Sequence, residues 1–148
     1  MKEFRVVTTK DEYIDSLLIR REVFCFEQNV SYEDELDFVD KDRIIINGYE
    51  NGQVVATGRI NFKERGAKFE RICVLKDFRS KSWGKDLMLY MINFCLDEKL
   101  GKIVDEFILE GQVQAMGFYE KLGFIKEGEM FYDAGIPHYL MRKKVNKN

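Results

Sequence analysis

Hydrophobic positions along the chain alternate in some stretches and recur at helical spacing in others, and the two patterns predict an order of elements. Residues 4–8 alternate and are rich in β-branched side chains, which predicts a first strand. A helix is expected over residues 11–24, with Thr9 or Asp11 as its N-cap. The acidic residues 27–40 show neither pattern, and we expect this stretch to be irregular.

Three strands are predicted next, joined by Gly-containing turns. Residues 43–49 and 54–62 flank Asn51-Gly52, a dipeptide that supplies the positive φ angles of a two-residue hairpin turn. A further turn at Arg65-Gly66 leads into residues 68–75. These strands are expected to form an antiparallel meander.

The second half of the chain alternates between helix and strand patterns. Residues 83–100 have helical spacing and are followed by Gly101, a residue suited to a helix C-terminus. A strand over 103–109, a short helix over 113–122 ending at Gly123, and strands over 124–130 and 138–145 complete the order. This order predicts an α+β fold with α/β/α layers: a mixed, mostly antiparallel central sheet of about six to seven strands with helices on both faces.

Composition narrows the class of protein. The 148 residues, 45% of them hydrophobic and 34% charged, have the balance of one globular domain spanning residues 1–148. The formal net charge of -2 shows no basic field, so no nucleic-acid partner is expected. Residues 88–96, the longest apolar stretch, are too short to cross a membrane, and the N-terminus lacks the apolar run of a secretory signal. We expect a cytoplasmic protein without a membrane partner.

The cysteine and histidine content argues against disulfide and metal chemistry. Cys25, Cys73 and Cys95 are odd in number, widely spaced and set among hydrophobic residues, as expected of reduced thiols in a core. His138 is the single histidine, and no spacing typical of a metal site occurs. No metal is predicted.

The most informative segment runs from a predicted apolar strand into a short basic loop that opens the long helix. Backbone N–H groups and the positive end of the helix dipole meet Arg79, Lys81 and Lys85 there, which is a phosphate-binding arrangement. The alternative is an ordinary strand-to-helix connection with solvated lysines. A Walker A loop is excluded, because Arg79 and Asp86 stand where glycine and a hydroxyl residue are required, and no G-x-G-x-x-G occurs.

Two motifs resemble the GCN5-related N-acetyltransferase (GNAT) superfamily. Its pyrophosphate loop, Arg/Gln-x-x-Gly-x-Gly/Ala, is matched by Arg79-Ser80-Lys81-Ser82-Trp83-Gly84. Its later signature, an amide residue, an alanine three positions on and a tyrosine ahead of Gly-Phe, is matched by Gln112, Ala115, Tyr119 and Gly123-Phe124. The predicted element order extends the resemblance over nearly the whole chain. Finer matches to a small bacterial subgroup of acetyltransferases lie in residues 21–24, 27–30, 70–75 and 133–138.

The loop departs from the family pattern at one position. Ser82 stands where the family has its first loop glycine. If this residue adopts a positive φ or lies against a phosphate, its side chain weakens cofactor binding by about 1 kcal/mol or more. A hydrogen bond from the Ser82 hydroxyl to a phosphate oxygen would offset part of that loss.

The resemblance implies acetyl-CoA as cosubstrate and assigns residues to it. Its pantetheine would lie along the strand near Val74, where a backbone N–H polarises the thioester carbonyl and two strands splay apart near Val74 and Leu109. Tyr119 would protonate the departing thiolate, or else be a core aromatic; Gln112 would hold the pantetheine amides, or else cap a helix. The cofactor-binding residues implied are Ile72, Cys73, Val74, Arg79, Ser80, Lys81, Ser82, Trp83, Gly84, Lys85, Gln112, Ala115, Phe118 and Tyr119.

The general base is harder to assign. Glu70 precedes the cofactor strand and is our candidate, the alternative being a cross-strand ion pair with Arg59 or Arg71. Glu110 is the reserve, and His138 is a further base or substrate contact. Glu27, residues 33–37 and Asp133 form either an electronegative rim for a cationic amine or a solvated loop. Glu27, Glu110 and His138 are our substrate-binding candidates.

The function that the resemblance implies is direct transfer of an acetyl group from acetyl-CoA to a primary amine, and we expect the acceptor to be a small molecule. Cys73 lies in an apolar strand without a neighbouring base, so a covalent acetyl-cysteine step is disfavoured. A non-catalytic acyl-CoA-binding sensor and a protein-lysine acetyltransferase are the alternatives. A homodimer through Phe131 and Tyr132 is a further hypothesis.

Overall fold

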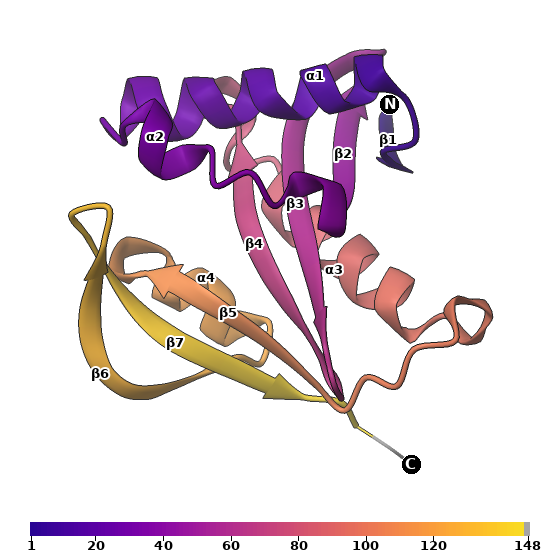
Figure 1. The fold of residues 1–148 in the computed structure, drawn as a ribbon, viewed down its shortest axis with the longest axis vertical. Helices are drawn as coiled ribbons and strands as arrows, with labels where there is room; N and C mark the ends of the chain where they lie inside the picture. Colours follow the sequence, from indigo (N-terminus) through magenta and orange to yellow (C-terminus); the bar gives the residue numbers. More distant parts are fainter. Residues whose placement is uncertain (147–148) are drawn as a thin grey trace.

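The computed structural model describes residues 1–146 and is built around one mixed sheet (Figure 1). Its seven described strands lie in the order β1-β2-β3-β4-β5-β7-β6, and only β4 and β5 pair in parallel. The α+β fold with a mixed, mostly antiparallel sheet is therefore confirmed. The strands are β1 (Lys2–Val6), β2 (Ile44–Glu50), β3 (Gln53–Lys63), β4 (Gly66–Val74), β5 (Glu106–Gln112), β6 (Ile125–Asp133) and β7 (Ile136–Lys144).

Helices cover both faces of the sheet. On one face, here called the α1 face, α1 (Lys10–Arg20) continues as a π-helix, η1 (Arg21–Glu27), and the Ser16 hydroxyl of α1 lies 2.7 Å from that of Thr57 on β3. The opposite α3 face carries α3 (Trp83–Leu96), whose Met91 lies against Gly58 of β3, and α4 (Met116–Lys121). Short 3-10 turns are η2 (Asp40–Asp42), η3 (Lys76–Phe78), η4 (Glu98–Leu100) and η5 (Val113–Ala115).

Local sequence signals account for several element ends. Asn51 and Gly52 have φ angles of 49° and 86°, as a two-residue hairpin turn between β2 and β3 requires. Thr9 is the N-cap of α1: its side chain accepts from the Glu12 N–H, and the Glu12 carboxylate accepts in return from the Thr9 N–H. The predicted cap and turn are both confirmed.

Several predicted boundaries are wrong. The strand predicted over residues 103–109 lies three residues later, as β5 (Glu106–Gln112). The long helix ends at Leu96 instead of residue 100, because Asp97 is extended and its side chain accepts from the Lys99 N–H, which starts η4. Gly101 is left-handed as expected, with φ 70°, but it closes η4. The stretch over residues 27–40 is not irregular throughout: it contains the short helix α2 (Tyr32–Glu35), capped by Ser31.

Strands β4 and β5 pair only along their first halves. Their register runs from Gly66 opposite Glu106 to Phe69 opposite Leu109, and beyond these residues the two strands have no ladder between them. Figure 1 shows β4 and β5 meeting near the C-terminus of the chain and diverging toward α1 and α2. The splay implied near Val74 and Leu109 is thus present. None of the helices in the described part of the chain is long and apolar enough to cross a membrane.

Candidate active site

A cavity of about 870 Å³ fills the space where β4 and β5 diverge. On one side it reaches the loop before α3, and on the other it reaches α2 and the turn between β6 and β7. Because pairing with β5 stops at Phe69, the β5-facing backbone edge of β4 is free of a strand partner along the cavity. Arg71, with φ 54°, lies in a β-bulge here, since the register of β3 and β4 shifts between Thr57 and Arg59.

The loop before α3 has the backbone of an anion cradle. Ser80 and Ser82 are both left-handed with φ 64°, and Ser82 is the N-cap residue of α3. The first N–H groups of a helix have no partner within the helix, and they point out of its positive end. A Cβ on Gly84 would lie 3.1 Å from Phe118 Cζ, so glycine there allows α3 to approach α4 closely. The positive φ considered for Ser82 is therefore found.

Replacing Ser82 with glycine is expected to stabilise the fold and tighten coenzyme A binding. A left-handed conformation at a non-glycine residue destabilises the folded chain by roughly 1–2 kcal/mol, and glycine removes this strain. Glycine also has more conformational freedom in the unfolded chain, which reduces the gain in stability by about 0.5–1 kcal/mol. Removing the hydroxymethyl group from the cradle should lower the Kd for coenzyme A about fivefold, measured by calorimetry. Asn51→Gly, a left-handed position in the β2–β3 turn, should leave that Kd unchanged. Weaker binding by Ser82→Gly would instead assign the hydroxyl to a phosphate.

Arg79 connects the loop to the end of β4 and to η1. Its Nε donates to the Val74 carbonyl at 3.0 Å, and its Nη2 donates to Glu27 Oε1 at 2.8 Å. Glu27, predicted to contact the acceptor, does not line the cavity and is the ion-pair partner of Arg79. Lys81 does not line it either: its carbonyl accepts from Lys2 Nζ, and its own Nζ lies over the Phe78 ring.

Tyr119 lies on the α3 face of the opening. It is 9% exposed, packs edge-to-face against Phe118 and Phe124, and lines the cavity. A Cβ on Gly111 of β5 would lie 3.1 Å from the Tyr119 ring. The absence of a side chain at Gly111 therefore lets the ring pack directly against the β5 backbone. Burial raises the pKa of the Tyr119 phenol well above its usual value, which keeps the hydroxyl proton in place at neutral pH.

Cys73 is buried on β4 and lines the same cavity as Tyr119. Burial raises the pKa of its thiol well above the usual range, with small contributions from surrounding charged groups. A thiol that keeps its proton is a poor nucleophile. The expectation that Cys73 does not carry the acyl group is consistent with this environment.

The α1 face of the opening carries the remaining candidates. Lys68 Nζ donates to Glu110 Oε1 at 2.9 Å across β4 and β5. Gln112 exchanges side-chain amide hydrogen bonds with Gln28, at 2.9 and 3.2 Å, and so joins the end of β5 to the end of η1. No role was predicted for Gln28 from the sequence, although it lies within residues 27–30, which match the bacterial subgroup. Only its long-range contact with Gln112 in the folded chain indicates a role at this site.

Buried ion pairs hold the segment from α2 to η2 on the α1 face. Arg59, 3% exposed on β3, donates to Asp37, Asp40 and Glu70. Arg20, 1% exposed, pairs with Glu35 and with Asp40 at 2.9 Å. The alternative role considered for Glu70, a cross-strand ion pair, is therefore present, and its partner is Arg59. Glu70 also accepts a hydrogen bond from Arg43 at 3.2 Å.

This network alters the expected electronegative rim. Glu35 is buried against Arg20, and Asp37 is paired with Arg59 although its side chain is still 33% exposed, so both carboxylates are engaged by arginines. Burial on its own would raise the pKa of Asp37, but the hydrogen bond and charge of Arg59 lower it to about 2. Asp34 and Asp133 still line the cavity.

The cavity brings together most of the residues singled out from the sequence. Glu70, Glu110 and His138 line it, as do all the implied cofactor residues except Lys81. Phe131 is not the exposed hydrophobe expected, because its ring stacks on His138, whereas Tyr132 is 68% exposed. Among residues 1–146 no cluster of three or more His, Cys, Asp or Glu side chains is arranged to hold a metal ion.

Comparison with known proteins gives consistent matches over this whole architecture. The model of the Acetyltransferase (GNAT) domain matches residues 9–145. YjcF of Bacillus subtilis (strain 168), described as an uncharacterized N-acetyltransferase, is 36% identical over 139 residues, which cover 93% of this chain and 96% of YjcF. The crystal structure of Escherichia coli ElaA has a TM-score of 0.83 at 27% identity and covers 97% of this chain and 100% of that one.

A more distant solved structure shares the fold. PaiA N-acetyltransferase from Thermoplasma acidophilum, in complex with coenzyme A, has a TM-score of 0.72 at 17% identity. It covers 98% of this chain and 99% of its own.

Proposed function

Because the chain belongs to the GNAT acetyltransferase family and is an acyl-CoA-dependent N-acyltransferase, we propose that it transfers an acetyl group directly from acetyl-CoA to a primary amine of a small molecule. One observation carries this proposal. A single cavity joins the anion cradle before α3, the buried hydroxyl of Tyr119 and the charged α1 face. Cosubstrate and acceptor can therefore meet between β4 and β5.

The residues around the cavity fit a nucleotide-tailed thioester. The left-handed loop and the N-terminus of α3 offer N–H groups to a diphosphate, with Lys85 beside them. The unpaired edge of β4 from Ile72 to Val74 offers strand-like hydrogen bonds to the pantetheine amides. The Arg79 side chain on the Val74 carbonyl would have to yield that acceptor or share it. PaiA, which has the same fold, was solved in complex with coenzyme A, and this supports coenzyme A as the ligand.

The chain's own groups then supply what acyl transfer requires. When bound, acetyl-CoA brings the reactive thioester. An N–H on the free edge of β4 stabilises the negative charge that develops on the carbonyl oxygen. Tyr119, whose raised pKa keeps it protonated, donates its proton to the departing thiolate. Buried Cys73 takes no covalent part.

Thiol release measured with acetyl-CoA over a panel of polyamines, amino sugars, amino acids and lysine peptides tests the proposal. We expect saturable turnover with at least one small primary amine and a slower rate with lysine peptides. Coenzyme A binding should be measured on the same samples by calorimetry. Saturable binding without turnover on any amine would favour the acyl-CoA sensor, and preference for peptides would favour protein-lysine acetylation. No binding at millimolar coenzyme A would contradict the cofactor site itself.

A further inference from the structure

The sheet register sorts the candidate proton-transfer groups by face. Directly opposed residues of paired strands present their side chains on the same face, and every second residue of a strand returns to it. Gln112 and His138 are opposed across β5 and β7, and Glu110 is two residues before Gln112. Lys68 reaches Glu110, which places Lys68 and Glu70 on this face as well. Tyr119 lies on the other face, against Gly111.

This division matches the two proton transfers of the proposed reaction. The hydroxyl on the α3 face lies on the side of the anion cradle, so it suits the departing thiolate. The proton of an incoming ammonium ion must be removed on the α1 face, where Glu70, Glu110 and His138 line the cavity. The question is which of the three has a basic atom available.

Both carboxylates already hold cations. Glu70 Oε1 accepts from Arg43 at 3.2 Å and from Arg59 at 2.9 Å, and its Oε2 lies 4.0 Å from Lys68 Nζ. Glu110 Oε1 accepts from the same Lys68. Within the described part of the chain each carboxylate therefore keeps one oxygen without a hydrogen bond, but its other oxygen is engaged by a guanidinium or ammonium group, and a substrate proton would have to compete with that cation for the same carboxylate. Glu70 also holds Arg59 within the buried ion-pair network, and this structural role is enough to explain the position of Glu70.

His138 differs because one of its nitrogens is fixed and the other is free of partners. Nδ1 lies 2.7 Å from the Ile136 carbonyl, and since a carbonyl oxygen only accepts, Nδ1 carries the proton. In the neutral ring Nε2 then holds the lone pair. Within residues 1–146 no hydrogen bond or ion pair involves Nε2, while His138 as a whole is 8% exposed and lines the cavity.

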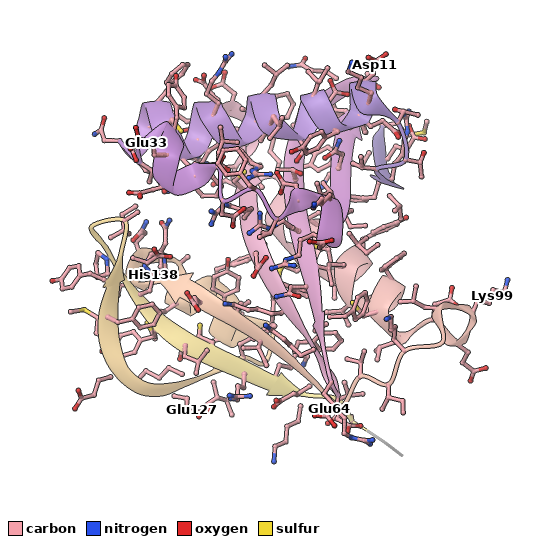
Figure 2. The ribbon with its side chains drawn as sticks, viewed as in Figure 1. Asp11, Glu33, Glu64, Lys99, Glu127 and His138 are labelled. Atoms are coloured by element: carbon pink, nitrogen blue, oxygen red, sulfur yellow. The ribbon has the colours of Figure 1, made fainter. Side chains whose placement is uncertain are left out.

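The ring is also held in orientation. It stacks on Phe131 of β6, with centroids 5.8 Å apart and planes at 21°. Stacking on one side and the Nδ1 hydrogen bond together restrict both rotation and tilt, so Nε2 keeps one direction. Figure 2 shows His138 below α2, beside the turn between β6 and β7. A base is useful only if its lone pair is held where the proton arrives.

We propose that His138 is the general base of the acyl transfer, an inference that rests on the proposed function. Nε2 takes one proton from the acceptor ammonium ion and becomes imidazolium, with Nδ1–H kept on Ile136. The amine lone pair forms the C–N bond, the C–S bond breaks, and its electron pair leaves on sulfur, which takes the Tyr119 proton. The new amide nitrogen returns its surplus proton to Tyr119, and the imidazolium proton passes to solvent. The net products are amide, thiol and one proton.

His138→Asn tests this assignment, because Asn can still donate to the Ile136 carbonyl but has no basic nitrogen. Two acceptors of similar size are compared: an alkyl amine, protonated at neutral pH, and an aromatic amine, already neutral there. We expect kcat/KM for the alkyl amine to fall about a hundredfold or more, and for the aromatic amine by less than about tenfold. A purely structural role would lower both equally. His138→Gln is the second variant, and circular dichroism with coenzyme A calorimetry establishes that each variant is folded.

The competing assignments, in which Glu70 or Glu110 is the general base, are tested with Glu70→Gln and Glu110→Gln on the same two acceptors. Each should change both rates by the same factor. An acceptor-dependent loss in either of them, with an equal loss or none in His138→Asn, would overturn the role of His138. A wild-type chain that binds coenzyme A but releases no thiol with either amine or the wider panel would instead refute the proposed function, and this inference with it.

Discussion

Replacing Arg59 with methionine is expected to lower the free energy of unfolding by about 3–5 kcal/mol, because it removes one partner of a buried ion-pair network. Arg59 is 3% exposed and donates to Asp37, Asp40 and Glu70. Methionine fills a similar volume but leaves Asp37 without its main cation. For a chain of this size the change corresponds to a fall in Tm of about 10 °C or more, measured by urea and thermal denaturation.

Arg65→Met is the matched control. Arg65 precedes β4 and pairs with Asp105, but the two side chains are 59% and 32% exposed. An exposed ion pair is worth about 0–1 kcal/mol, so this variant should unfold close to wild type. Similar stabilities for the two variants would contradict the importance assigned to burial.

Acid titration gives a second readout of the same network. The pKa of Asp37 in the folded chain is lowered to about 2 from 3.8, so its contribution to stability is complete above the unfolded value and is lost as pH falls toward 2. Wild type should therefore lose stability between about pH 4 and pH 2. Arg59→Met should lose less over that range, because the pKa of Asp37 then lies nearer its unfolded value. Equal pH slopes would show that Arg59 is not the cause of the shift.

Features determined by neighbouring residues could be predicted from the sequence. The Asn51-Gly52 turn and the Thr9 cap each depend on backbone preferences within a few positions. The two family motifs likewise lie in short segments, and the structure brings both to one cavity. Alternation and helical spacing were sufficient for the order of the strands and of every helix except α2, though not for every end.

Features determined by distant contacts could not be predicted. Arg20 and Arg59 look like ordinary surface charges in the sequence, and only the folded chain brings Glu35, Asp37 and Asp40 to them. The same contacts order the segment that composition suggested was irregular. They also explain why the roles of Glu70 could not be separated from the sequence: its cross-strand partner Arg59 is visible in the pattern, but its second partner, Arg43, lies outside that strand pair.

Replacing Tyr119 with phenylalanine is expected to lower kcat by about 10²-fold with little change in the Kd for coenzyme A. The hydroxyl is the only group removed, and the ring keeps its contacts with Phe118, Phe124 and Gly111. The loss should fall at the lower end of general-acid effects, because a thiolate is a stable leaving group. Single-turnover thiol release at saturating acetyl-CoA measures the chemical step, and calorimetry measures binding.

Tyr90→Phe is the control for removing a phenolic hydroxyl from the same domain. Tyr90 on α3 stacks on Phe4, and like Tyr119 it has no hydrogen bond from its hydroxyl in the described chain. It does not line the cavity, so both kcat and coenzyme A affinity should stay at wild-type values. If Tyr119→Phe also turned over at the wild-type rate, the thiolate would leave without protonation by this residue. Tyr119 would then be a core aromatic, as its contacts with Phe118 and Phe124 alone suggest.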